Sequence, residues 1–212
     1  MSASVEKLVR SEKNPDSFYL TLTDGRKMTV GLSIVAEHGL YTGRELAEDE
    51  LSRLADAAAE YGAKLRALRM AAARPLSRGE LTDRLVRKGE TREKAEKAAD
   101  YLEKIGALND AEYADMIVRH YTALGYGRER IRSELYRRRV PREYWEEALE
   151  TAPDPAGTID AVIERRLRGR TPDAAELRKL AGALARRGFS WQDIKEALAR
   201  YGAGPEEDFY DI

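Results

Sequence analysis

Residues 81–89 read LTDRLVRKG, and this short pattern returns twice farther along the chain. Residues 131–139 read IRSELYRRR and residues 180–188 read LAGALARRG, so the copies lie about 50 residues apart. Each copy has two aliphatic side chains four positions apart, a basic residue three positions later, and then Gly, Arg or Gly. Apolar residues four apart share one face of a helix, and glycine is common where a helix ends. The pattern predicts a helix followed by a tight turn in each copy.

The residues after each predicted turn suit the start of a further helix. Thr91, Pro141 and Ser190 occupy these positions, and apolar residues follow at helical spacing. A helical segment also precedes each copy, over residues Ala63–Ala73, Asp110–Ala123 and Ala156–Leu167. We expect a mainly α protein in which three tandem three-helix repeats, with helices of 10 to 15 residues, stack into an elongated curved rod.

The N-terminal segment has the composition of strands instead. Val5–Arg10, Ser17–Thr23 and Arg26–Val30 are rich in Val, Thr, Tyr and Leu, and turn sequences separate them at residues 14–16 and 24–25. We expect a small three-stranded sheet or hairpin that is too small to be stable alone. Its apolar face should pack on the residues that follow, namely Leu32, Ile34, Val35, Leu46, Leu51 and Leu54.

These patterns divide the chain into five segments. We place the sheet and short helices in residues 1–61, the repeats in residues 62–107, 108–152 and 153–204, and an acidic tail in residues 205–212. Residues 64–204 carry 30 basic and 23 acidic side chains, a net charge of +7, whereas residues 1–63 carry 7 and 11. A positive body between acidic ends suits an acidic or polyanionic partner. The tail is expected to be a disordered, solubilising end, or to compete with DNA for the basic surface.

Several classes of protein are disfavoured by the composition. The chain has no cysteine, which excludes disulfides and thiolate metal sites, and no segment approaches the ~20 apolar residues of a membrane span. His38 and His120 are far apart, and neither a phosphate-binding glycine loop with lysine nor a helical metal motif is present. We therefore expect a soluble, cytoplasmic protein that is not an enzyme and has no cofactor or metal.

A dense basic segment in the second repeat is the candidate contact surface. Arginines interleave there with Tyr126, Tyr136, Tyr144 and Trp145, a mixture that can bind phosphates and stack on bases. The alternative is a solvated helix face, because Glu129 and Glu134 can pair with neighbouring arginines. The candidate residues are Tyr126, Arg128, Arg130, Arg132, Arg137, Arg138 and Arg139, with the more ordinary Arg84, Arg87 and Lys88 of the first repeat.

Aromatic residues outside this segment have a simpler interpretation. Tyr113, Trp145, Phe189 and Trp191 lie on apolar stripes and are expected to pack between helices. Tyr126 differs, because it lies between Gly125 and Gly127 in a predicted loop. Contact with a partner and a packing role both remain open for Tyr126.

Two stretches of the second repeat resemble the RecX family. Residues 108–114, LNDAEYA, and residues 125–135, GYGRERIRSEL, are similar to the central repeat of RecX proteins. Residues 67–89 are similar to the first repeat, and residues 39–46, GLYTGREL, resemble the N-terminal extension of longer members. The resemblance covers nearly the whole chain. The departure is at Arg138-Arg139, where the family pattern usually has Lys-Gly, so the turn geometry there needs a different explanation.

The resemblance implies a regulatory protein that binds in the groove of the RecA filament on single-stranded DNA. It would inhibit ATP hydrolysis and strand exchange by the recombinase, acting as a monomer in homologous recombination, DNA repair and the SOS response. A second hypothesis is a stand-alone DNA-binding protein, because each repeat contains a helix-turn-helix-like pair. Steep salt dependence without a recombinase would distinguish it. A helical scaffold for an unrelated partner is the third hypothesis.

Overall fold

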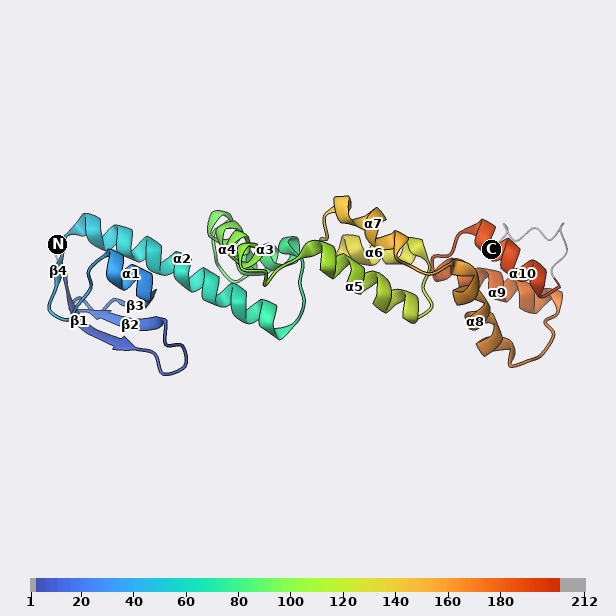
Figure 1. Cartoon of the computed structure of the whole chain (residues 1–212), viewed down its shortest axis with the longest axis horizontal. Helices are drawn as coiled ribbons and strands as arrows, with labels where there is room; N and C mark the ends of the chain where they lie inside the picture. The colour runs from blue at the N-terminus through green and yellow to red at the C-terminus, as the bar shows by residue number, and fades with distance from the viewer. Residues whose placement is uncertain (1–2, 203–212) are drawn as a thin grey trace. The chain divides into compact units, whose positions relative to one another are not determined.

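The computed structural model describes residues 3–202, and the acidic tail at residues 205–212 lies outside them. The chain forms two compact units (Figure 1). The first contains the described residues up to Pro75 together with Leu81–Leu108. The second contains Leu76–Glu80 and the described residues from Asn109 onward.

The first unit begins with an antiparallel sheet of four strands in the order β3-β2-β1-β4. The predicted sheet is confirmed, but the prediction of three strands was wrong. β1 (Ala3–Arg10), β2 (Ser17–Leu22) and β3 (Lys27–Gly31) match the predicted strands, and β4 (Glu45–Leu46) adds to the edge of β1. A strand of two residues has no alternating pattern in the sequence, so only its pairing with β1 reveals it.

The apolar face of this sheet packs on the helices that follow. Val5, Leu20 and Val30 of the sheet join Ile34, Leu46, Leu51 and Leu54 in one buried cluster, and Val35 is partly buried against it. These are the predicted packing residues, with one correction. Leu32 is 51% exposed because it begins α1 (Leu32–Glu37) on the side away from the cluster.

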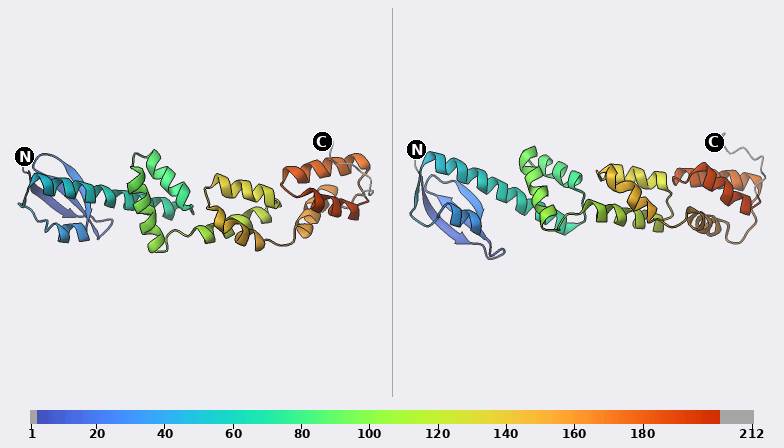
Figure 2. Two further views of the ribbon diagram at one scale, coloured as in Figure 1. Left: turned by 90° about the horizontal axis from the view of Figure 1, so that it is seen from above. Right: turned by 45° about the horizontal axis from the view of Figure 1, so that its top comes forward.

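A single long helix connects the sheet to the first repeat. α2 spans 26 residues, Glu48–Ala73, so the predicted helix at Ala63–Ala73 is only its C-terminal part and the expected length of 10 to 15 residues was wrong. Gly62 does not interrupt it, since the surrounding alanine-rich sequence outweighs a cost of about 1 kcal/mol. In both views of Figure 2, α2 lies along the sheet, and farther along its length it packs beside α4. The predicted boundary between residues 61 and 62 falls inside this helix.

The three-helix repeats are confirmed. The first repeat ends in α3 (Arg78–Arg87) and α4 (Arg92–Lys104). The second consists of α5 (Asp110–Ala123), α6 (Arg128–Arg137) and α7 (Trp145–Glu150), which a short 3-10 turn at Arg142–Tyr144 precedes. The third consists of α8 (Pro155–Leu167), α9 (Ala174–Arg186) and α10 (Trp191–Arg200). Each of the last two repeats has its own buried apolar cluster.

The middle helix of every repeat ends in the same turn. Gly89, Arg139 and Gly188 have φ angles of 94°, 57° and 84°, all in the left-handed region. In each turn the next amide donates back to the helix, from Glu90 N to Leu85 O, from Val140 N to Leu135 O and from Phe189 N to Leu184 O. Arg139 therefore adopts the conformation that glycine adopts in the other two repeats, at a cost of about 1–2 kcal/mol. The missing glycine does not alter the turn.

At two of these turns, the N-terminal residues of another helix pack against the backbone of the turn, within the second unit. Ser77 Oγ donates to Arg138 O at 2.5 Å, which explains why residues 76–80 belong to this unit. Gly127 N donates to Arg187 O at 2.9 Å, and Glu129 N donates to Gly188 O at 3.1 Å. A Cβ atom on Gly127 would lie 2.3 Å from Gly188 O, so the two backbones approach too closely for any other residue.

Replacing Gly127 by alanine should therefore separate α6 from the turn at Gly188. We expect Gly127→Ala to lower the free energy of unfolding by about 1–3 kcal/mol, as overpacking does in well-packed cores. Urea denaturation followed by circular dichroism measures the loss. Faster amide exchange at Gly127 and Glu129 would locate it.

The matched control is Gly157→Ala in α8, where nothing lies within 4 Å of the added Cβ. This change should raise stability by about 0.5–1 kcal/mol, since alanine has the higher helix propensity. Equal effects of the two substitutions would contradict a specific close approach at Gly127.

Candidate functional site

The predicted contact residues fall into two groups, one in each unit. Arg87 and Lys88 are exposed at the C-terminal end of α3, where Arg84 is half-buried. The seven residues of the second repeat lie on α6 and in the turns that flank it. Arg128, Arg130, Arg137 and Arg139 are exposed, whereas Tyr126, Arg132 and Arg138 are half-buried.

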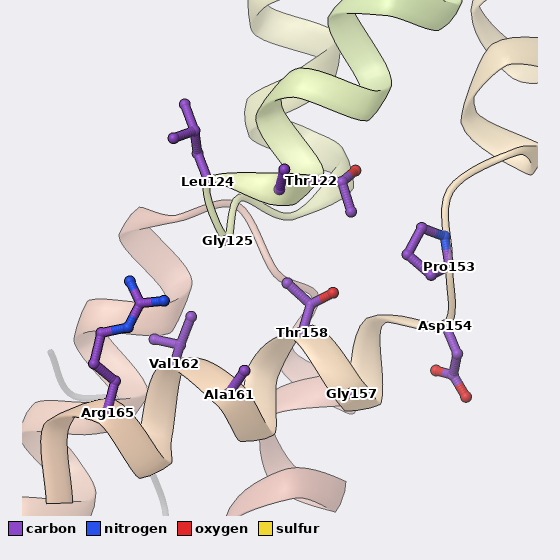
Figure 3. A pocket seen from close by; sticks show the side chains of 11 residues that line it. Thr122, Leu124, Gly125, Pro153, Asp154, Gly157, Thr158, Ala161, Val162 and Arg165 are labelled. Atoms are coloured by element: carbon purple, nitrogen blue, oxygen red, sulfur yellow. The ribbon is translucent and has the colours of Figure 1, made fainter. Parts of the chain in front are cut away.

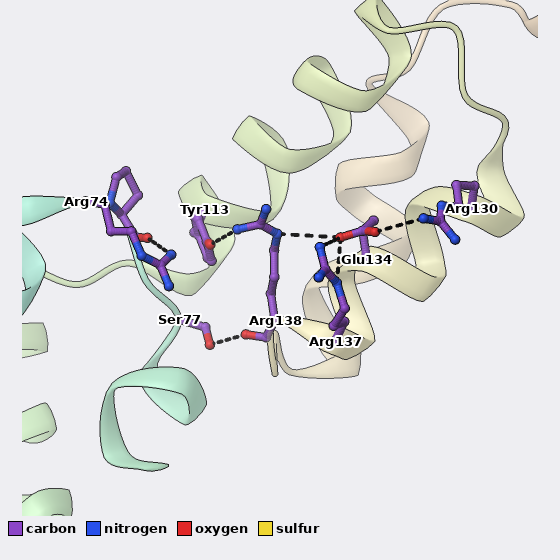
Figure 4. Close-up of polar contacts among 8 residues, drawn as sticks. Arg74, Ser77, Tyr113, Arg130, Glu134, Arg137 and Arg138 are labelled. Atoms are coloured by element: carbon purple, nitrogen blue, oxygen red, sulfur yellow. Dashed lines mark hydrogen bonds and ion pairs between the residues drawn. The ribbon is translucent and has the colours of Figure 1, made fainter. Parts of the chain in front are cut away.

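Glu134 organises most of the arginines of the second repeat (Figure 4). Its carboxylate is buried, with a side-chain exposure of 4%, and it accepts hydrogen bonds from Arg137 at 3.0 and 2.6 Å. Arg130 lies 3.5 Å from one carboxylate oxygen and Arg138 lies 3.8 Å from the other. Arg138 also donates to the hydroxyl of Tyr113 at 2.9 Å. One buried acid therefore holds three predicted contact residues in place.

The pKa of the Glu134 carboxyl reflects two opposing effects. Burial acts to raise it, but hydrogen bonds with Arg137 and Tyr121 and the positive charges of Arg137 and Arg130 outweigh burial. The pKa of Glu134 is consequently lowered from its ordinary value. The carboxylate stays ionised at neutral pH and neutralises part of the positive charge around it.

A second ion-paired group lies on the same helix. Arg132 donates to Glu129 at 2.6 Å and to both carboxylate oxygens of Glu146 at 3.1 and 3.2 Å. The local pairing that the sequence left open thus occurs at Arg130, Arg132, Arg137 and Arg138. Pairing does not remove Arg137 and Arg130 from the surface, because their side chains are 68% and 49% exposed. A role for these residues in binding stays a prediction.

Tyr126 has a packing role in the structure. Its ring centroid lies 5.7 Å from that of Tyr121, and the guanidinium groups of Arg187 and Arg130 lie 5.4 and 6.0 Å from it. Such cation–π contacts stabilise the loop by about 0.5–1 kcal/mol each at exposed sites. The four predicted packing aromatics are also buried or half-buried: Tyr113, Phe189, Trp145 and Trp191.

A cleft between the second and third repeats was not predicted. Its volume is about 420 Å³, and it lies between the C-terminal end of α5 and α8 (Figure 3). Thr122, Leu124 and Gly125 line one side, and Thr158, Val162 and Arg165 line the other. Within residues 3–202, the buried Thr122 Oγ1 has no hydrogen-bond partner. Sequence patterns report residues on one helix face, so they gave no signal for a cleft whose two sides come from different repeats.

Among residues 3–202, no group of three or more His, Cys, Asp or Glu side chains is arranged to hold a metal ion. No helix within the same residues is both long and apolar enough to span a membrane.

Comparisons with known proteins agree with this organisation. Residues 109–149 match the family model described as the second three-helix domain of RecX, and residues 158–198 match the third. The Regulatory protein RecX of Chromohalobacter salexigens is 34% identical over 134 residues, which cover 63% of this chain and 88% of that protein. The chain belongs to the RecX family. The RecX protein of Acidithiobacillus ferrooxidans is 35% identical over 149 residues, 68% of this chain and 91% of the relative.

Solved RecX structures have the same fold. A crystal structure of regulatory protein RecX covers 93% of this chain with a TM-score of 0.72 and 20% identity. RecX from Lactobacillus salivarius covers 68% with a TM-score of 0.62 and 19% identity. The mainly α fold with an N-terminal sheet and RecX repeats is therefore confirmed, and so is the family resemblance. The second RecX domain, residues 109–149, contains all six predicted contact arginines of the second repeat.

The buried carboxylate predicts a specific dependence of stability on pH. Glu134→Gln should lower the free energy of unfolding at neutral pH by about 1–3 kcal/mol, because it removes charged hydrogen bonds from a buried group. A lowered folded pKa means that Glu134 contributes stability above its unfolded pKa of about 4.3. That contribution is lost as the pH falls through the folded pKa.

The difference between wild type and Glu134→Gln should therefore shrink below about pH 4. Denaturant titrations at a series of pH values measure it. Glu147→Gln, which changes an exposed carboxylate of α7, is the control and should have little effect at any pH. A difference for Glu134→Gln that persists unchanged in acid would show that its ionised form contributes nothing.

Proposed function

We propose that this chain is a regulator, and specifically an inhibitor, of the RecA recombinase, and that it acts by binding the RecA filament on single-stranded DNA. The observation that carries the proposal is membership of the RecX family, whose relatives named Regulatory protein RecX match along 88% and 91% of their own length. Binding in the filament groove would alter ATP hydrolysis, strand exchange and filament assembly. The protein would act in the cytoplasm, as a monomer and without catalysis.

The surface of the second repeat supports a binding role. Arg128 is exposed at the start of α6, Arg137 is exposed near its end, and Arg142 follows with its guanidinium 5.7 Å from the ring of Trp145. A filament that carries DNA is a polyanion, and exposed cations increase the rate and strength of association with such a partner. Residues held by Glu134 would be pre-arranged, which lowers the entropic cost of binding.

The proposal is tested by the rate of DNA-dependent ATP hydrolysis of preformed RecA filaments as the protein is added. We expect inhibition by the wild type. The double variant Arg128→Glu, Arg142→Glu should need roughly tenfold more protein for the same inhibition, equivalent to about 1.4 kcal/mol. These residues are chosen because reversing Arg137 or Arg138 would also disrupt the pairs with Glu134.

The matched control is Arg178→Glu, Lys179→Glu, which makes the same change in net charge on exposed residues of α9. It should inhibit like the wild type. No inhibition by saturating wild-type protein, combined with binding to naked DNA that weakens steeply with salt, would replace the proposal with a stand-alone DNA-binding function. Equal loss in both variants would show only an effect of net charge.

A further inference from the structure

The turn that ends the middle helix is covered in two repeats and open in the first. At Arg139 and Gly188 the first turn of another helix lies directly against the turn. A Cβ atom on Gly79 would lie 2.9 Å from both Arg139 Cβ and Arg139 O, and one on Gly188 would lie 2.3 Å from Arg130 N. At Gly89, which has the same conformation, a Cβ atom would have nothing within 4 Å.

The two covered turns show which groups bind to the left-handed turn at the end of a middle helix. Carbonyl groups at the end of a helix have no partner within the helix, and neither have the first amide groups of the next one. At the Gly188 turn these two sets meet, because Gly127 N and Glu129 N donate to Arg187 O and Gly188 O at 2.9 and 3.1 Å. At the Arg139 turn the donor to Arg138 O is a side-chain hydroxyl, Ser77 Oγ, at 2.5 Å. The helix dipoles are also aligned favourably, since a positive N-terminus faces a negative C-terminus.

The first turn has the same shape but presents it outward. Glu90 N donates to Leu85 O at 3.1 Å, as in the other repeats, and Lys88 and Gly89 are exposed. Lys88 is equivalent in sequence to Arg138 and Arg187, whose carbonyls accept the hydrogen bonds in the covered turns. Arg87 and Lys88 add two exposed cations beside the open turn. An acidic side chain in the first turn of a bound helix would complement them.

α9 of a second copy does not have the helix start that covers the other turns. The repeated pattern starts with an aliphatic residue, which is Leu81 in α3 and Ile131 in α6. Each of these helices begins three residues earlier, at Arg78 and at Arg128. α9 begins at Ala174, six residues before Leu180, so its N-terminus extends one turn farther. α9 therefore begins differently from α3 and α6, and those two helices already cover turns within this chain. This favours a helix of another protein as the occupant.

We propose that the turn at Arg87–Glu90 binds the N-terminus of an α-helix of a partner protein. The helix would have glycine at its cap or second position, as Gly127 and Gly79 do in the covered turns, and an acidic residue in its first turn. The inference rests on the proposed function in one respect, since the test uses the recombinase filament as the source of the helix.

The test attaches a photoreactive benzophenone at this turn. The chain has no cysteine, so Lys88→Cys provides a single attachment point, and Lys104→Cys at the end of α4 provides the control. Both labelled proteins are irradiated with RecA filaments, and the cross-linked peptides are identified by mass spectrometry. From position 88 we expect adducts concentrated in the first turn of one recombinase helix, and at least about tenfold fewer from position 104.

The outcomes separate the two proposals. If wild-type protein neither binds nor inhibits filaments, the proposed function fails. If it inhibits, but adducts from position 88 fall on DNA, on loops or nowhere, the proposed function stands and this inference is overturned. Arg87→Glu, Lys88→Glu should weaken filament binding about tenfold while leaving the thermal midpoint within a few degrees of wild type. Unchanged binding by this variant would also overturn the inference.

Discussion

The end of a helix leaves backbone carbonyls without partners, and the repeats of this protein are built around that constraint. A left-handed residue at 89, 139 and 188 reverses the chain, and the amide that follows satisfies one carbonyl of the helix. At the second and third turns the remaining carbonyls accept hydrogen bonds from another helix start. The same backbone feature thus ends each middle helix and supplies the contact between neighbouring segments of the second unit.

Glu134 gives the basic surface of the second repeat its order. A buried carboxylate is tolerated because arginines surround it, and in return it holds Arg137, Arg130 and Arg138 in defined positions. The surface therefore combines fixed cations with freer ones such as Arg128. For a regulator that acts by binding, this arrangement provides positive charge at a reduced entropic cost. It also explains why counting the arginines alone overestimates the net positive character of α6.

The sequence predicted the helices and turns more closely than the contacts. The predicted segment Asp110–Ala123 coincides with α5, and Ala156–Leu167 differs from α8 by one residue. The failures were the two-residue strand β4 and the division of α2, where Gly62 does not break an alanine-rich helix. In the candidate site, the sequence already indicated that glutamates could pair with arginines three and four residues away, as the alternative to a contact surface. The burial of Glu134 was not indicated, because it depends on packing between α5 and α6.

What the sequence determined by itself is therefore local: the positions of helices, the three repeated turns and the family to which the repeats belong. Helical periodicity and turn preferences act over a few residues, so they are legible in one chain. Tertiary structure alone decided which turns are covered, since Ser77 meets Arg138 and Gly127 meets Arg187 across about 60 residues of sequence. It also decided the cleft beside Thr122 and the open turn at Gly89. Those features depend on which surfaces approach closely in space, and no pattern along the chain records that.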